Sequence, residues 1–255
     1  PQISLDDPMT TARDIQQTFT RHRGLELRST WQSTQPYKRH SHAQLSIGAI
    51  VEGQTRCVCH GQQYLLRPGD IIVIPAHVPH SCNPLLGQAR SYHMLYLDTE
   101  QPIAQQHIRS EALFGLYLAV VEQMSTAAVD ALLAALTLRV DVGDALRPTS
   151  QQVQQALLSD PASPPSLDDL AQRLSLRKET LIRTFKQDTG LTPGSFLNVS
   201  RVEYAKARLR AGDDIADVAY QSGFADQSHF HKTFVSYTAA TPRQYALGRS
   251  ISDNN

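Results

Sequence analysis

The sequence predicts an α+β, multidomain chain, with an amino-terminal β-barrel, a helical hairpin and an all-α carboxy-terminal domain. Three observations predict this class. Short β-rich runs fill residues 31–98, apolar residues recur at helical spacing beyond residue 108, and the last hundred residues contain an internal repeat. The 255 residues are enough for two domains, each with its own core.

The β-rich runs are short and are separated by turn residues. They cover 44–51, 55–59, 64–66, 71–75 and 91–97. Glu52-Gly53, His60-Gly61 and Pro68-Gly69-Asp70 lie between them, as expected for an antiparallel meander, sandwich or barrel. We assign residues 1–104 to this first domain.

Two amphipathic segments then predict a helical hairpin over residues 105–147. The apolar residues that share a face are Leu113, Leu116, Tyr117, Val120 and Val121 in the first segment and Val129, Leu132, Leu133, Leu136 and Val140 in the second. This apolar stripe either packs on the barrel or forms a dimer interface, and both interpretations stay open. A homodimer is therefore one expectation.

The last hundred residues contain two copies of one pattern. Phe185 and Pro193 in the first copy correspond to Phe234 and Pro242 in the second, each 49 residues later. Each copy reads as a short helix, a tight turn and a second helix, over about 166–189 and 214–237, which is a helix-turn-helix. We assign residues 148–255 to this domain, with the boundary within 144–150.

A connecting helix is predicted between the copies, over about 193–211. Pro193 stands near its start and Gly212 just past its end, the usual asymmetry of a helix. Nineteen residues span roughly 28 Å, close to the ~34 Å between successive major grooves on one face of DNA. One chain can therefore present two recognition helices to adjacent grooves.

The overall charge hides a local excess of basic residues. The 24 Lys and Arg balance the 24 Asp and Glu, which by itself argues against a nucleic-acid partner. Residues 173–210, however, contain nine basic and three acidic side chains, a net charge of +6. Such a basic belt, on one recognition helix and the connecting helix, is what phosphate binding requires.

The segment Ser166–Ala246 resembles the DNA-binding domain of the AraC/XylS family of transcription regulators. The motifs that carry the resemblance are Ser-Leu-Asp-Asp-Leu-Ala171, Phe185-Lys-Gln-Asp-Thr-Gly190, Arg201-x3-Ala205, Ile215-Ala-Asp-Val-Ala219, Gly223-Phe224 and Phe230-x3-Phe234. Val235, Ala239 and Ala246 depart from the family pattern, which leaves the second copy less basic than usual. The resemblance therefore implies that the second copy binds DNA more weakly.

The resemblance also implies which residues contact DNA. The residues expected to read bases lie on the two recognition helices and are Lys178, Glu179, Ile182, Arg183, Gln227, Ser228, His231 and Lys232. Arg177 and Lys186 are expected to contact phosphate. Double-stranded DNA is the expected partner, with RNA polymerase a second one if the protein is an activator.

Two segments of the first domain resemble the motifs of the cupin barrel. His40-Ser-His42 matches the first, with Ser46 where Glu is usual, and the run from Gly69 to His80 matches the second. His40, His42 and His80 could together bind Zn, Ni or Fe. Three interpretations stay open: a polar wall of an effector pocket without metal, a metal site, or structural histidines.

The resemblance implies that the barrel binds a small effector. The candidate pocket residues are Trp31, Tyr37, His40, His42, Gln44, Ser46, His80 and His93. Gln44 and Ser46 share the strand phase of His42, so burial of all three predicts a polar effector.

The sequence favours a DNA-binding regulator over an enzyme. A three-histidine, metal-dependent cupin enzyme is the alternative, but we find no nucleophile signature and no acid–base pair. A DNA-bending protein has no reason to carry a pocketed barrel.

The sequence also indicates a cytoplasmic location. We expect no membrane partner, because the longest apolar run, residues 112–121, is half the length of a membrane span. The first residues show no secretory signal, and three cysteines disfavour a disulfide framework.

Overall fold

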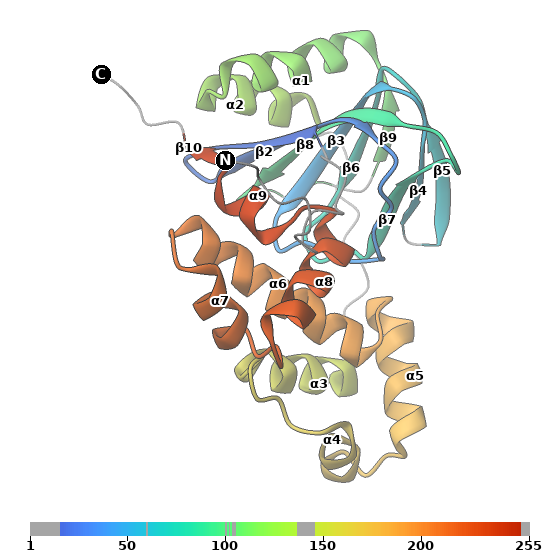
Figure 1. Ribbon diagram of the computed structural model, residues 1–255. Helices are drawn as coiled ribbons and strands as arrows, with labels where there is room; N and C mark the ends of the chain where they lie inside the picture. Colours follow the sequence, from blue (N-terminus) through green and yellow to red (C-terminus); the bar gives the residue numbers. More distant parts are fainter. Residues whose placement is uncertain are drawn as a thin grey trace, which may run out of the picture.

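The computed structural model describes residues 16–59, 61–99, 101, 103, 106–136 and 146–250. A β-domain with two covering helices lies above a helical domain in Figure 1. The α+β class predicted from the sequence is confirmed.

Two sheets form the β-domain. The strands are β1 (Gln16–His22), β2 (Leu25–Ser33), β3 (Leu45–Glu52), β4 (Thr55–Cys59), β5 (Gln62–Leu66), β6 (Asp70–Ile74), β7 (His80–Pro84), β8 (Arg90–Leu97), β9 (Gln106–Arg109) and β10 (Arg249–Ser250). The large sheet has the order β10-β1-β2-β8-β3-β6-β9, and the small one β5-β4-β7; their strands are antiparallel except for the β1–β10 pair. Side chains of both sheets, such as Ile72, Cys57 and Tyr92, meet in a core between them.

The other face of the large sheet is covered by the helical hairpin, α1 (Glu111–Gln123) and α2 (Thr126–Leu136). Tyr117, Val120, Leu132 and Leu133 are buried against strand residues such as Ile47. The hydroxyl of Tyr117 donates to the carbonyl oxygen of Ile47, with 3.0 Å between the oxygens. In the described residues the apolar stripe therefore packs on the barrel; Val140 lies outside them.

The cysteine prediction is wrong. Cys57 on β4 lies directly opposite Cys82 on β7, and the two sulfurs form a disulfide. The pairing depends on the register of two strands that are 25 residues apart in sequence, which an odd cysteine count does not reveal.

The helical domain contains both predicted helix-turn-helix units. Its helices are α3 (Pro148–Ser159), α4 (Leu167–Arg173), α5 (Lys178–Thr189), α6 (Pro193–Arg210), α7 (Ile215–Gln221), α8 (Gln227–Thr238) and α9 (Pro242–Ala246). Side chains cap the helix starts: Ser166 accepts from the backbone N–H of Asp169, and Thr192 accepts from that of Ser195 ahead of Pro193.

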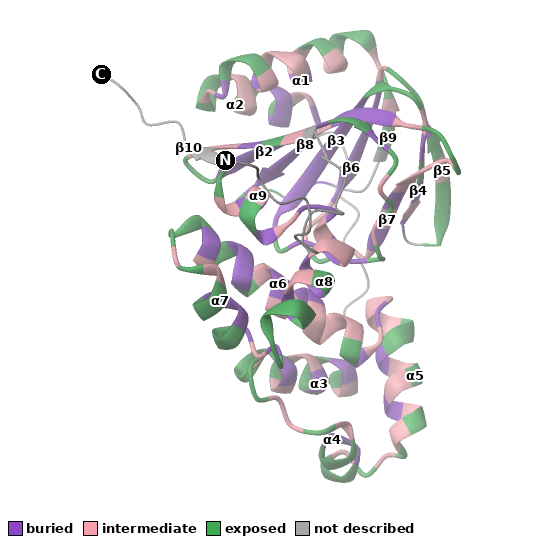
Figure 2. Ribbon diagram, viewed as in Figure 1, coloured by how far each residue is buried: buried purple, intermediate pink, exposed green. Residues whose placement is uncertain are grey.

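Two small cores hold the two units, and α6 joins them. Leu181 and Phe185 pack with α3 and α4 in the first core, and Phe230 and Phe234 pack with α6, α7 and α9 in the second. In Figure 2 the buried positions follow the inner faces of these helices, and the outer faces of α4, α5 and α7 are largely exposed. The phenylalanines of the repeat are thus core residues.

The β-domain and the helical domain are joined by more than a linker. The short strand β10 pairs in parallel with β1, so residues after α9 extend the amino-terminal sheet. Phe19 of β1 is buried in the second helical core, with its ring 4.9 Å from that of Tyr245. Among the described residues, no helix is both long and apolar enough to cross a membrane.

Candidate functional site

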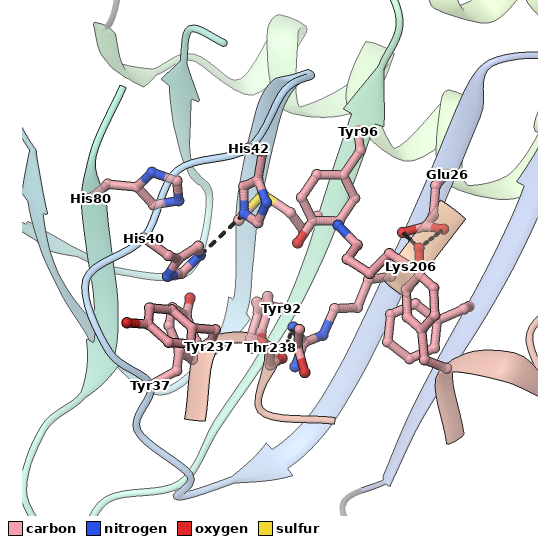
Figure 3. A pocket seen from close by; sticks show the side chains of 14 residues that line it. Glu26, Tyr37, His40, His42, His80, Tyr92, Tyr96, Lys206, Tyr237 and Thr238 are labelled. Atoms are coloured by element: carbon pink, nitrogen blue, oxygen red, sulfur yellow. Dashed lines mark hydrogen bonds between the residues drawn. The ribbon is translucent and has the colours of Figure 1, made fainter. Parts of the chain in front are cut away.

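A narrow pocket lies where the open end of the barrel meets the helical domain (Figure 3). Its barrel side is lined by Phe19, Glu26, Arg28, Tyr37, His40, His42, His80, Tyr92, Met94 and Tyr96, and its other side by Lys206, Tyr237, Thr238 and Tyr245. The cavity volume is about 20 Å³. A buried water needs at least ~10–15 Å³ on this measure, so the pocket has room for an ion or one to two waters.

Three histidines form one wall of the pocket. His40 and His80 are a directly bonded cross-strand pair, since each backbone N–H donates to the other's carbonyl oxygen, at 2.9 and 2.7 Å. His42 follows two residues later, and its ring centre lies 4.7 Å from that of His40 and 5.3 Å from that of His80. Figure 3 shows the three rings turned toward one another.

The environment of these histidines keeps them neutral. Burial lowers the pKa of all three rings, and neighbouring histidines lower it further for His40 and His80. The pKa of His80 falls to about 3. At neutral pH the wall therefore offers uncharged imidazole nitrogens.

Lys206 of α6 reaches into the pocket from the helical domain. It is 3 % exposed, its ammonium lies 3.0 Å from a Glu203 carboxylate oxygen, and it sits over the rings of Tyr96 and Tyr245 at 5.3 and 5.7 Å. Burial alone would lower the pKa of Lys206, but the negative charges of Glu203 and Glu26 raise it. The ammonium therefore stays charged although it is buried.

Arg28 is a second buried cation, and it comes from β2. Its Nη1 donates to the carbonyl oxygen of Thr238 at 2.5 Å, and its Nε donates to Thr30 Oγ1 at 3.3 Å. Its Nη2 has no hydrogen-bond partner among the described residues. A buried N–H without an acceptor is costly, so this group marks a place where an acceptor is missing.

The structure brings together half of the predicted effector residues. Tyr37, His40, His42 and His80 line the pocket. Ser46 is buried but does not line it, and the amide of Gln44 donates to Asp98 instead.

Trp31 and His93 also lie away from the pocket. Trp31 is 40 % exposed and meets the His93 ring edge-on, and His93 Nδ1 pairs with Ser29 Oγ at 2.7 Å. The rings of His40 and His42 lie together as expected, but His40 makes only an isolated bridge and His42 lies outside the strands. The strand pattern could not show which end of the barrel the helical domain covers.

Sequence reasoning missed several residues that line the pocket. Glu26 and Arg28 alternate with Leu25 and Leu27, a pattern typical of a β-strand. The charged face of such a strand usually contacts water, so the pattern does not predict that these two side chains line a pocket. Lys206, Tyr237 and Tyr245 have no local signal, because the barrel that covers them is far away in sequence.

The DNA-facing residues expected on α5 and α8 are mostly exposed. Those fully at the surface are Arg177, Glu179, Arg183, Lys186, Gln227, Ser228 and Lys232. His231 and Lys178 are half-buried, and the Lys178 ammonium is 2.8 Å from Asp168. Ile182 packs against the core of the first unit.

Several cations of the basic belt on α6 are bound within the chain. Lys206 points into the pocket, Arg201 donates to the carbonyl oxygen of Pro161, and Arg208 pairs with Asp213. Arg210 lies 3.9 Å from Glu26. Local charge counting cannot separate a phosphate-facing cation from one that the rest of the chain neutralises.

Two family models match the chain. An AraC-like ligand binding domain matches residues 20–160, and a helix-turn-helix domain matches residues 170–247. The uncharacterized HTH-type transcriptional regulator YbfI of Bacillus subtilis is 27 % identical over 226 residues, covering 76 % of this chain and 82 % of that protein. The HTH-type transcriptional activator RhaS of Escherichia fergusonii is 40 % identical over 88 residues, covering 34 % of this chain and 32 % of RhaS.

Solved structures share most of the fold. ToxT from Vibrio cholerae matches with a TM-score of 0.60 at 14 % identity, over 88 % of this chain and 97 % of ToxT. At that identity the likeness concerns the fold alone. A ligand-binding barrel joined to two helix-turn-helix units defines a DNA-binding transcription regulator. The chain belongs to the AraC family of these regulators.

Proposed function

We propose that the chain is a cytoplasmic, sequence-specific regulator whose signal is a small polar effector bound in the pocket between its domains. The observation that carries this proposal is that Lys206, Tyr237 and Tyr245 of the helical domain close a pocket whose other walls belong to the barrel. A ligand larger than one or two waters has to move these side chains, because the cavity is about 20 Å³. Effector binding is thereby linked to the position of α6 and of both recognition helices.

The chemistry of the pocket favours an effector with an acidic group. Arg28 offers an N–H without a partner, and the ammonium of Lys206 lies in the same pocket. An anion would satisfy both cations through charge-assisted hydrogen bonds. One of the ToxT structures holds an unsaturated fatty acid, which also carries a carboxylate, and we propose the same kind of group here.

We propose sensing and not catalysis for the barrel. The pocket is closed by the helical domain, so a substrate would have to open the interface between the domains in every turnover. A sensor, by contrast, uses that opening as its signal. The three-histidine enzyme remains the alternative, to be tested by turnover assays with metal-loaded protein.

The remaining partners follow from the same arrangement. DNA would meet the exposed residues of α5 and α8. Because the RhaS relatives are activators, we propose that this chain also activates, through contact with RNA polymerase. We propose a homodimer as well; it would use a surface other than the apolar stripe of α1 and α2, which packs on the barrel in the described residues.

The test begins with DNA selected from a random pool by the purified full chain. Fluorescence anisotropy then measures its affinity with and without a panel of small carboxylic acids, each paired with its neutral amide. We expect one or more acids, but not their amides, to change the affinity about 5–150-fold.

A pair of arginine variants makes this test specific. Arg28→Gln should lose the response, and Arg56→Gln, an exposed arginine on β4, should keep it. Failure to select any DNA sequence would contradict the regulator, and equal responses to acids and amides would contradict the acidic effector.

A further inference from the structure

We propose that His40, His42 and His80 bind a divalent transition-metal ion and that Glu203 of α6 positions one of these ligands, so that metal occupancy holds the helical domain against the barrel. This inference rests on the proposed function and deepens it, because it assigns a second ligand to the same pocket and a regulatory effect to that ligand.

The backbone holds the three ligands before any ion arrives. The bonded pair His40 and His80 fixes two of them, and the N–H of His77 donates to the carbonyl oxygen of His42 at 2.6 Å. One ligand atom from each ring lies within 4.8 Å of the others, and all three residues are buried. A site held by a hydrogen-bonded backbone is preorganised, so binding needs little rearrangement.

Each ring is oriented by a hydrogen bond at Nδ1. His40 Nδ1 lies 2.7 Å from the carbonyl oxygen of Lys38, and His80 Nδ1 lies 2.9 Å from that of Val78. His42 Nδ1 lies 3.4 Å from a Glu203 carboxylate oxygen. These oxygens can only accept, so the proton sits on Nδ1 and the lone pair on Nε2. Metal-binding histidines are usually held by carbonyl or carboxylate oxygens in this way.

The Nε2 atoms then lack a partner that suits them. His40 Nε2 and His42 Nε2 are 3.1 Å apart, and in this tautomer each presents a lone pair to the other. Two acceptors at hydrogen-bond distance need a proton or a metal ion between them. A metal ion accepts all three lone pairs at once.

The size and charge of the pocket also fit an ion. In this closed arrangement the cavity of about 20 Å³ has room for an ion or a water without movement of its walls. Lys206 and Arg28 line the same pocket and oppose a dication, and the carboxylates of Glu203 and Glu26 offset them. Neutral imidazole prefers borderline ions such as Zn²⁺, Fe²⁺, Co²⁺ and Ni²⁺ to Mg²⁺ or Ca²⁺.

Glu203 connects this site to DNA binding. It belongs to α6, the helix that joins the two helix-turn-helix units, and it bonds both His42 of the barrel and Lys206 of its own helix. A metal ion on Nε2 makes Nδ1–H a stronger donor, which strengthens the bond to Glu203. Metal binding therefore favours the closed arrangement, and by linkage the closed arrangement favours metal binding.

The test uses the full chain purified without chelators. Elemental analysis counts bound metal, and after metal removal Co²⁺ is titrated while its visible absorption is followed, with Zn²⁺ as competitor. We expect about one ion per chain and a saturable Co²⁺ spectrum. His40→Ala and His80→Ala should each abolish both, while His93→Ala, a histidine outside the cluster, should keep both; circular dichroism checks that each variant is folded.

The variant Glu203→Gln tests whether the Glu203 carboxylate positions the His42 ring for metal binding. It should weaken Co²⁺ binding about 10–100-fold. The control is Glu111→Gln, an exposed carboxylate at the start of α1, and it should leave the Co²⁺ affinity unchanged. Hydrogen exchange of α6 should slow on adding Zn²⁺ to the wild type but not to Glu203→Gln.

The outcomes are distinct. A folded chain with no saturable Co²⁺ spectrum overturns the metal site. Equal metal affinity and equal α6 protection in wild type and Glu203→Gln overturn the coupling. A chain that binds no Co²⁺ but still binds selected DNA and responds to a carboxylic acid overturns this inference and leaves the proposed function in place. A chain that binds Co²⁺ but selects no DNA overturns the proposed function and leaves the metal site in place.

Discussion

Single residues decide how this chain links sensing to DNA binding, and Lys206 shows it best. In the sequence it is one of nine basic residues between 173 and 210 and reads as a phosphate contact. In the structure it is buried against the barrel and paired with Glu203. Lys206 differs from its neighbours on α6 because the barrel, whose residues are far away in sequence, covers it.

Replacing Lys206 by Met should destabilise the fold through Glu203. Removing one partner of a buried ion pair leaves the other charge without compensation, and we expect a loss of about 3 kcal/mol in the free energy of unfolding. Urea denaturation measures it, with Lys232→Met, an exposed lysine of α8, as the control. The double variant Lys206→Met/Glu203→Gln should recover part of the loss; a double variant with the sum of both losses would contradict the pairing.

Two exposed residues of α5 should affect DNA binding differently. Arg183→Ala should weaken binding by about 1–3 kcal/mol and relax the preference at one base position. Lys186→Ala should weaken binding to all sequences and reduce the salt slope by about one. Anisotropy titrations at several salt concentrations measure both. Arg208→Ala, whose guanidinium already pairs with Asp213, should leave the slope unchanged; a changed slope would restore α6 to the phosphate-binding surface.

At the scale of elements, most of the fold could be predicted. The runs expected at 44–51 and 91–97 are β3 and β8 within one residue at each end, and the repeat located both helix-turn-helix units, because local periodicity and capping determine such elements. Strands β1 and β7 and most of β2 were missed, and β9 (Gln106–Arg109) lies in the segment that we assigned to the helical hairpin. Glu26 and Arg28 give β2 a charged face that normally contacts water, but here Tyr245 and Thr238 cover it.

The turn of the second helix-turn-helix offers a test of packing at this scale. Gly223 has a φ of +79°, and a Cβ there would lie 2.5 Å from the Cα of Ala162. Gly212 has a φ of +91° with nothing nearby. Gly212→Ala should therefore lose about 1 kcal/mol from backbone strain alone, and Gly223→Ala about 1–3 kcal/mol more from the clash. Thermal unfolding compares them; equal losses would show that Ala162 does not restrict the turn.

At the scale of the whole molecule, the interface between the domains carries the function and is the part that the sequence could not predict. Strand β10 joins the amino-terminal sheet, Arg28 bonds Thr238, and Glu26 accepts from Tyr245. Each contact joins residues more than 200 positions apart. Local sequence patterns carry no information on such pairs. Four pocket residues of the barrel were therefore predicted, but none of the helical-domain residues that close the pocket.

Acid should loosen this interface through Glu26. Burial alone raises the pKa of Glu26, but the charges of Lys206 and Arg21 and hydrogen bonds from Arg21 and Tyr245 lower it below 4.5. The unfolded chain therefore binds the proton more readily, so the contribution of Glu26 is present above its unfolded pKa and is lost as pH falls through the folded value. Urea unfolding measures the free energy of unfolding from pH 7 to pH 3, and it should fall more steeply for wild type than for Glu26→Gln. Parallel curves of free energy against pH would contradict this role.

The most direct test of the account compares the affinity of wild type and Lys206→Met for the DNA sequence that the wild type selects. Lys206 is buried in the pocket and does not face DNA. If the pocket controls the recognition helices, the DNA affinity of the variant should differ from that of the wild type at least about fivefold, with the same salt slope. Both proteins are compared at a temperature where circular dichroism shows them folded. Affinities equal within a factor of about two would mean that DNA binding does not depend on the closed pocket, and would contradict the account.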